Sequence, residues 1–190
     1  MESEDGLEDP LARAKSGDES GFFMLWTDLQ PRLLRYLHVL GCADVDGVAG
    51  GTWLHAIRDL ERFQGNAADF RAWLFTIGRH RALDAARSRT RSRDRIPGPA
   101  SAAAQPLSQP GPVEDEVLYG LSTSQAIAIV RALSKEQAEV VALRIIAGLD
   151  TDAVAALLGK SPGSVRAALH RGLKALSKDP RVRAMDTVAP

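Results

Sequence analysis

Apolar residues recur every three to four positions over most of this 190-residue chain, a spacing that predicts helices rather than strands. Runs of alternating β-branched residues bounded by hairpin turns, the usual sign of strands, are nearly absent. In the first half we expect helices over residues 31–40, 44–60 and 70–91, with Pro31 at the first position of the first and Gly41 at its end. One side of the second helix would carry Val45, Val48, Ala49, Thr52, Ala56 and Leu60.

The second half predicts a series of shorter helices. Residues 114–133 contain one or two of them, and Ser134 followed by Gln137 has the capping-box spacing of a helix start. That helix would end near Gly148, and a short one would span 152–158. A three-residue turn then leads to a last helix with Ser161 as its N-cap and proline at its first position. Two helices joined by a short glycine-containing turn are typical of a helix-turn-helix motif.

A proline-rich segment, Ile96–Val113, separates the two halves. It contains five of the ten prolines and no charged residue, so it cannot continue a helix or join a sheet. We therefore predict an all-α protein of two small domains, an N-terminal helical bundle and a C-terminal helix-turn-helix domain. The expected divisions are an acidic tail at 1–18, the first domain at 19–95, the linker at 96–113, the second domain at 114–180 and a tail at 181–190.

The net charge is zero, but the charges are segregated along the chain. Residues 1–20 hold seven acidic and two basic residues, whereas residues 71–95 hold eight arginines against two aspartates. Residues 160–183 hold seven basic residues against a single aspartate. Two basic blocks far apart in the sequence indicate two surfaces that meet polyanions.

The last predicted helix divides into an apolar face and a basic face. Val165, Ala168 and Leu169 fall on one side with Gly172 and Leu176, as expected of a helix that packs with one face and enters the major groove with the other. A solvated basic face on a packed helix is the simpler alternative, but the turn, the cap and the charge together favour DNA binding. The candidate DNA contacts here are Ser161, Ser164, Arg166, Ala167, His170, Arg171 and Lys174.

The helix predicted over 70–91 is the second basic surface. Arginines crowd its C-terminal half, and pairing with the helix dipole, at about 0.3–1 kcal/mol per charge, explains only two or three of them. A nucleic-acid backbone accounts better for the whole run.

Several other classes of protein are excluded or disfavoured. A lone cysteine, Cys42, makes no internal disulfide, and no apolar run approaches the ~20 residues of a membrane span. The start of the chain is acidic where a secretion signal would be basic, so we expect a cytoplasmic protein without membrane insertion. His80 and Asp84, four residues apart, could form an acid/base pair or half a metal site, but a hydrogen-bonded structural pair is the simpler interpretation. Since no catalytic motif is present, we expect no enzyme, no cofactor and no metal.

Two segments resemble the bacterial RNA polymerase sigma factors of the extracytoplasmic-function (ECF) type. FRAWLFTIGRHRALDAARSR, at 70–89, is similar to the family's helix that binds the promoter −10 element. LSKEQAEVVALRIIAGLDTDAVAALLGKSPGSVRAALHRGLKAL, at 133–176, resembles its domain that reads the −35 element. The two segments stand in the family's order on either side of a proline-rich linker, which makes the signal specific.

The resemblance implies roles for particular residues. The loop over 64–69 would form a pocket for a flipped-out base of the non-template strand, with Asn66 as the donor and acceptor. Contacts to the −10 element would come from Asn66, Arg71, Arg79, His80 and Arg87. The helix over 44–60 would bind the clamp of the polymerase β′ subunit, and the C-terminal domain would lie on the β flap. Contacts to the polymerase would come from Asp44, Asp46, Gly50, Gly51, His55 and Arg58.

The chain departs from the family at several positions. Gly50 and Gly51 stand where members usually carry glutamine followed by an acid, and His80 stands where asparagine is common. Two glycines within a helix cost about 0.8–1 kcal/mol each relative to alanine and remove polar contacts. The main expectation is a promoter-specificity subunit that acts with core RNA polymerase, promoter DNA and an anti-sigma factor. The alternative is a two-domain helix-turn-helix regulator without productive polymerase binding.

Overall fold

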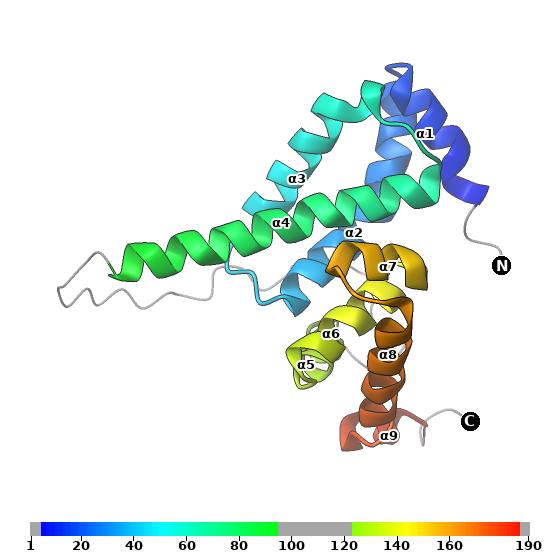
Figure 1. Cartoon of the computed structure of the whole chain (residues 1–190). Coiled ribbons are helices and arrows are strands. Elements are labelled where there is room, and N and C mark those ends of the chain that lie inside the picture. Colours follow the sequence, from blue (N-terminus) through cyan, green and yellow to red (C-terminus); the bar gives the residue numbers. More distant parts are fainter. Residues whose placement is uncertain (1–4, 95–122, 187–190) are drawn as a thin grey trace.

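The computed structural model of the chain describes residues 5–94 and 123–186, and within them every regular element is a helix (Figure 1). The N-terminal domain contains α1 (Glu8–Lys15), α2 (Glu19–Val39), α3 (Val45–Asp59) and the long α4 (Ala67–Asp94), with 3-10 turns at η1 (Asp5–Leu7) and η2 (Leu60–Arg62). The C-terminal domain contains α5 (Thr123–Arg131), α6 (Lys135–Val141), the π-helical turn η4 (Ala142–Ile146), α7 (Thr151–Leu158), α8 (Pro162–Leu176) and α9 (Pro180–Asp186). The prediction of an all-α protein is confirmed. The predicted linker over 96–113 lies outside the described residues.

The structure corrects the assignment of residues 1–18 to an acidic tail. Leu11 and Ala14 of α1 are buried against α2, and Gly21 is where the two helices meet most closely. A Cβ atom at Gly21 would stand 2.6 Å from Cβ of Arg13 and 2.8 Å from backbone atoms of α1. Only glycine allows this approach, so α1 is part of the N-terminal domain. Similarly, residues after 180, predicted as a tail, begin with α9.

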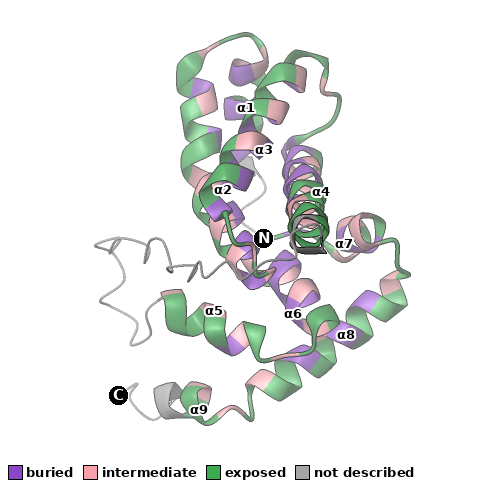
Figure 2. Ribbon diagram, turned by 90° about the vertical axis from the view of Figure 1, so that its left-hand side faces the viewer, coloured by how far each residue is buried: buried purple, intermediate pink, exposed green. Residues whose placement is uncertain are grey.

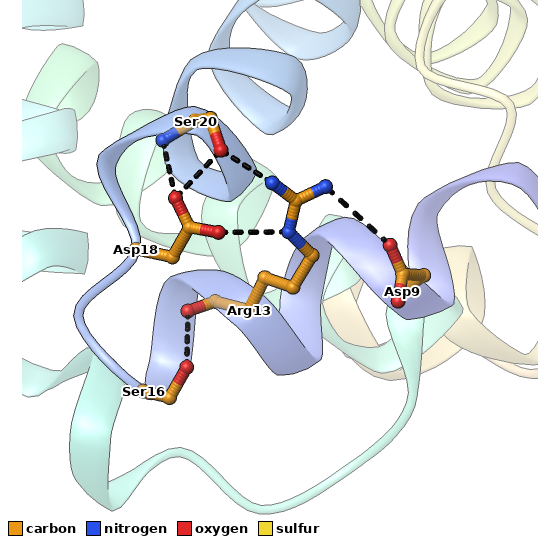
Figure 3. A network of polar contacts seen from close by, with 5 residues as sticks. All are labelled: Asp9, Arg13, Ser16, Asp18 and Ser20. Atoms are coloured by element: carbon orange, nitrogen blue, oxygen red, sulfur yellow. Dashed lines mark hydrogen bonds and ion pairs between the residues drawn. The ribbon is translucent and has the colours of Figure 1, made fainter.

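A polar network holds the junction between α1 and α2 (Figure 3). Asp18 is the N-cap of α2 and accepts a hydrogen bond of 2.8 Å from the backbone N–H of Ser20. Its second carboxylate oxygen accepts a hydrogen bond of 2.8 Å from Nε of Arg13. The other two nitrogens of this guanidinium contact the Ser20 hydroxyl and lie 3.7 Å from a carboxylate oxygen of Asp9, respectively. The hydrogen bond from the Ser20 side chain, followed by that from Arg13, holds the pKa of Asp18 well below its ordinary value.

Pro31 does not begin a helix, as the sequence analysis expected, but lies inside α2. Proline inside a helix removes one backbone hydrogen bond and usually costs about 3 kcal/mol. Here the apolar stripe of α2 continues through it, because Leu25, Leu29, Leu33 and Leu37 repeat every four residues and are all fully buried. Packing along the whole stripe therefore outweighs the local cost.

The apolar face predicted for α3 is correct. All side chains of that face are buried against the neighbouring helices: Val45, Val48, Ala49, Thr52, Ala56 and Leu60. α4 packs on the same core through Phe70, Leu74 and Phe75, and then extends past the other helices of its domain (Figure 1). Residues 86–91, towards its C-terminal end, are all exposed (Figure 2).

The helix-turn-helix geometry follows the sequence prediction. Ser134 and Asp150 cap α6 and α7, and Gly159 ends α7 with a φ of 65°, a left-handed conformation that favours glycine. Ser161 then caps α8, accepting a hydrogen bond of 3.2 Å from the backbone N–H of Ser164. α8 packs against α6 and α7.

The two domains contact each other. α2 packs against α5 and η4, and α4 packs against α7. One cluster of buried apolar side chains runs through both domains, from Leu25 of α2 to Val165 of α8. The C-terminal domain therefore lies directly on the N-terminal bundle (Figures 1 and 2).

Candidate nucleic-acid interface

One face of α8 is exposed and basic. Val165, Ala168 and Gly172 are buried against the neighbouring helices, and a Cβ atom at Gly172 would stand 2.8 Å from Cγ2 of Val141 on α6. The opposite face exposes all seven candidate contacts: Ser161, Ser164, Arg166, Ala167, His170, Arg171 and Lys174. The structure therefore brings these residues together on one surface of one helix. Small residues near its start leave the helix backbone accessible to a groove.

The predicted basic surface of α4 is divided into two parts. Towards its C-terminal end His80 and Arg87 are exposed, and Arg87 pairs with Asp84 at 3.1 Å. Nearer its start Arg71 is only 6% exposed, although it was predicted to contact DNA. The Asp84–Arg87 pair also corrects the interpretation of His80 and Asp84 as a partly buried structural pair, because both side chains are exposed.

Arg79 of α4 is paired with the other domain. Its Nε donates a hydrogen bond of 2.7 Å to Oε1 of Glu139 on α6, and both side chains are about four-fifths covered, with 21% and 18% exposed. The Tyr36 hydroxyl donates to the same carboxylate oxygen at 3.3 Å. Burial, followed by the negative charge of Glu139, raises the pKa of Tyr36 well above its ordinary value, so this hydroxyl stays protonated as a donor.

Hydrogen bonds organise the loop before α4. Asn66 and Asp69 exchange backbone-to-side-chain hydrogen bonds of 3.0 Å and 2.9 Å, so Asn66 is the N-cap of α4. Its side-chain oxygen accepts a hydrogen bond in this role, so the amide nitrogen is the polar atom that this cap does not use. Behind the loop Phe63 stacks on Trp73 with ring centroids 5.1 Å apart, and Phe70 meets both rings.

α1 supports this loop, which the sequence analysis did not anticipate. Oε1 of Glu8 accepts a hydrogen bond of 2.9 Å from the backbone N–H of Ala67 at the start of α4. Nζ of Lys15 lies 5.9 Å from the centroid of the Phe63 ring, a cation–π distance. No sequence signal pairs residues this far apart.

The residues predicted to contact polymerase lie along α3. Asp44 is its N-cap and accepts a hydrogen bond of 2.9 Å from the backbone N–H of Gly47. Asp46, Gly50 and Arg58 are exposed. His55 lies 3.2 Å from Asp59, which also pairs with Arg58 at 2.9 Å.

Two exposed apolar side chains on α3 were missed. Leu54 is 71% exposed and Ile57 is 48% exposed, on the outer side of the helix. Leu54 and Ile57 do not belong to the apolar face that the helical period predicts for α3. Large apolar residues outside such a face are expected to be exposed, and this signal could have identified them in the sequence. Gly50 has open space where a side chain would lie, whereas the guanidinium of Arg81 lies over Gly51.

A cavity of about 580 Å³ lies between the two domains. Apolar residues of α2, α4, α6 and α7 line it together with Glu136 and Glu139. Four exposed basic side chains also lie there: Arg89, Arg131, Lys135 and Lys160. Cys42 also lies there, and burial raises the pKa of its thiol.

A cluster of metal ligands or a membrane-spanning helix would indicate a function of another kind. Among residues 5–94 and 123–186 no group of three or more histidine, cysteine, aspartate or glutamate side chains could hold a metal ion. Across the same residues no helix has the length and hydropathy of a membrane span.

Comparisons with known proteins match both domains. The family model described as Sigma-70 region 2 matches residues 25–92, and the model described as Sigma-70, region 4 matches residues 124–176. The ECF RNA polymerase sigma factor SigD of Mycobacterium tuberculosis is 30% identical over 190 residues, covering 95% of this chain and 86% of SigD. The ECF RNA polymerase sigma factor BldN of Streptomyces coelicolor is 30% identical over 170 residues, which cover 88% of this chain and 63% of BldN.

Solved structures share the fold. CnrH in complex with the cytosolic domain of CnrY has a TM-score of 0.59 at 24% identity, covering 97% of this chain and 100% of that one. The sigma factor RpoE of Bartonella quintana, in complex with the anti-sigma factor NepR, has a TM-score of 0.59 at 21% identity, covering 89% of this chain and 98% of that one.

Proposed function

The chain belongs to the ECF family of RNA polymerase sigma factors, and we propose that α8 reads the −35 element while α4 and its preceding loop read the −10 element. A member of this family joins core RNA polymerase and directs promoter-specific initiation of transcription. Its family is one of initiation factors, which act by binding and not by catalysis.

The observation that carries the proposal is the exposed basic face of α8. Arg166 and Lys174 are eight residues apart, so they lie on the same side of the helix, two turns from one another. With Arg171 beside them, they supply the charges that phosphates and guanine edges require. The capped turn before Pro162 fixes the direction in which the helix start points.

The −10 assignment rests on the loop over 64–69 and on the exposed part of α4. Unpaired bases are bound through stacking and through hydrogen bonds to their edges. The amide nitrogen of Asn66 supplies a donor at the loop, and Arg87 supplies a positive charge further along α4. His80 is exposed between them and is the candidate for a difference in base preference from other members of the family.

Contact with polymerase is assigned to the outer face of α3. Gly50 and Gly51 leave this face without the polar side chains common in the family, but Leu54 and Ile57 offer it apolar area. We assign this face to the β′ clamp and the C-terminal domain to the β flap. Burial of an exposed leucine contributes about 1.5–3 kcal/mol, enough to replace lost polar contacts.

The test is run-off transcription with purified core enzyme on a library of promoter fragments. We expect discrete transcripts only when the chain is added, and a common pair of sequence elements upstream of their start sites. Binding of upstream duplexes without any transcript would instead favour a DNA-binding regulator that lacks productive polymerase contact.

An anti-sigma factor is the second proposed partner, and the cavity between the domains is the place where we expect it. Its apolar lining, and its four basic side chains against two carboxylates, suit an amphipathic helix with acidic residues on its outer side. CnrH and RpoE were solved with protein partners, the latter with the anti-sigma factor NepR. Co-purification from the native host, followed by competition with core enzyme, tests this: a partner that binds together with polymerase would contradict it.

A further inference from the structure

We propose that α1 positions the loop over 64–69 for the capture of a base, with Glu8 as the positioning residue that holds Asn66 in place. The inference rests on the proposed role of this loop in reading the −10 element, and it adds a specificity-determining residue that lies outside the loop. The match to the Sigma-70 region 2 model begins at residue 25, so α1 precedes the part of the chain that this model describes.

Two contacts from α1 bracket the tip of the loop. Glu8 and Lys15 are seven residues apart, which places them on the same side of α1, two turns from one another. Oε1 of Glu8 accepts the hydrogen bond of 2.9 Å from the backbone N–H of Ala67. Nζ of Lys15 lies 5.9 Å from the ring centroid of Phe63. Residues 64–66 are therefore held from α1 on both sides.

α1 is a fixed support because it is anchored to α2. Leu11 and Ala14 are 2% and 7% exposed and pack against that helix. Arg13 donates a hydrogen bond of 2.8 Å to Asp18, the N-cap of α2 (Figure 3). Glu8 cannot move away from the loop unless these contacts break.

The bond from Glu8 acts at the residue next to Asn66. Ala67 is only 2% exposed, so its N–H has little access to water as an alternative partner. A buried backbone donor that loses its partner is costly, and the first turn of α4 must open to hydrate it. Asn66 caps that turn through its hydrogen bond of 2.9 Å from the N–H of Asp69. Opening the turn therefore displaces the Asn66 side chain.

Base preference depends on this positioning more than general DNA affinity does. Only loops that hold the Asn66 amide in the competent conformation capture a base, so affinity for the preferred base falls with the competent fraction. Glu8 is acidic and contacts no phosphate, so loss of its hydrogen bond leaves the electrostatic part of binding in place. A purely structural role of Glu8 would lower stability without changing the preference between bases.

The chain offers matched variants for the test. Glu8→Ala removes the acceptor, whereas Glu8→Gln keeps an oxygen that accepts the same hydrogen bond. Asp150→Ala is the control for stability: it removes the N-cap of α7, which accepts a hydrogen bond of 2.7 Å from the N–H of Ala153 in the other domain. Asn66→Ala tests the loop itself.

The measurement is fluorescence anisotropy of labelled (dA)20, (dC)20 and (dT)20 with the full chain bound to core polymerase, and core polymerase alone gives the baseline. The quantity compared is the ratio between the strongest and the weakest affinity. We expect Glu8→Ala to lower this ratio by roughly fivefold, the effect that loss of one helix cap has on an equilibrium. Glu8→Gln and Asp150→Ala should keep the wild-type ratio. The salt dependence of the weakest affinity should be the same in all of them.

The double variant shows whether Glu8 acts through Asn66. Glu8→Ala should lower the ratio no further when Asn66→Ala is already present, since the two changes affect one interaction. A further fall, an unchanged ratio in Glu8→Ala, or an equal fall in Asp150→Ala would each overturn the inference.

Asn66→Ala separates this inference from the function on which it rests. A lower ratio in Asn66→Ala but not in Glu8→Ala would leave the proposed function standing and remove only the role of α1. If Asn66→Ala changes no ratio, the loop does not capture a base, and its proposed role and this inference both fail.

Discussion

Oε1 of Glu8 accepts a hydrogen bond from the backbone N–H of Ala67 at 2.9 Å, which joins the first residue of α1 to the first residue of α4. The bond satisfies one of the backbone donors that every helix start leaves open. It also fixes the loop that carries Asn66.

Glu8→Ala should lower the free energy of unfolding by about 1 kcal/mol, the usual effect of losing a helix cap. Glu8→Gln retains an oxygen that accepts the same hydrogen bond, so it should recover most of the loss. Urea denaturation followed by circular dichroism measures both. Equal destabilisation by the two variants would show that the charge, and not the hydrogen bond, is what matters.

Gly50→Ala should stabilise the protein by about 0.8–1 kcal/mol, because glycine is that much less favourable than alanine inside a helix. The site has open space for the added methyl group. Gly51→Ala is the comparison: the Arg81 side chain must move aside there, so its gain should be smaller. A thermal midpoint that rises less for Gly50→Ala than for Gly51→Ala would contradict this account.

Leu54→Ser should weaken binding to core polymerase with little effect on stability, since the side chain is 71% exposed in the free chain. We expect a loss of about 1–2 kcal/mol in binding free energy, from the apolar area no longer buried. Met24→Ser is the control, because Met24 is also exposed, at 47%, but lies on α2. Fluorescence anisotropy with labelled chain measures both affinities, and equal losses would remove α3 from the interface.

Arg166→Ala should reduce affinity for the upstream duplex element by about 1–3 kcal/mol and relax the preference at one base pair, as expected of a direct guanine contact. Arg35→Ala, an exposed arginine on α2, should leave duplex binding unchanged. Titration of cognate and scrambled duplexes gives both numbers. If Arg166→Ala binds both duplexes as the wild type does, the groove-facing side of α8 is misassigned.

Acid should weaken the junction of α1 and α2 through Asp18. Its pKa is lower in the folded chain than its ordinary value of 3.8, so its contribution to stability is fully present above that value. The contribution is lost as the pH falls from there towards the folded-state pKa. Asp18→Asn removes this titration, so its free energy of unfolding should fall less steeply than that of the wild type between pH 5 and pH 3, in urea titrations at each pH.

Local signals in the sequence predicted much of the fold. The caps at Ser134 and Ser161 and the basic face of α8 were predicted correctly, because each depends on residues within a turn or two of one another. The same reasoning wrongly placed a helix start at Pro31, because proline is common at the first position of a helix. The leucine stripe of α2, which continues on both sides of Pro31, was given less weight.

The parts of the site that the sequence could not predict depend on contacts between distant residues. Arg71 and Arg79 belong to the basic run of α4, and nothing near them in the sequence indicates that their side chains are largely covered. The partner of Arg79, Glu139, is sixty residues away. Likewise Asn66 was predicted to meet a base, but its side-chain oxygen caps α4, and Glu8, from the presumed tail, supports the same loop.

The contact between the domains also sets an order of events while the chain is being made. α2 and α4 are synthesised before any residue of α6, so Tyr36 and Arg79 have no Glu139 to meet at that stage. Domains generally fold as units in the order of synthesis. The nascent N-terminal domain therefore lacks the carboxylate partner of Arg79, and this ion pair can form only once α6 of the C-terminal domain has been synthesised.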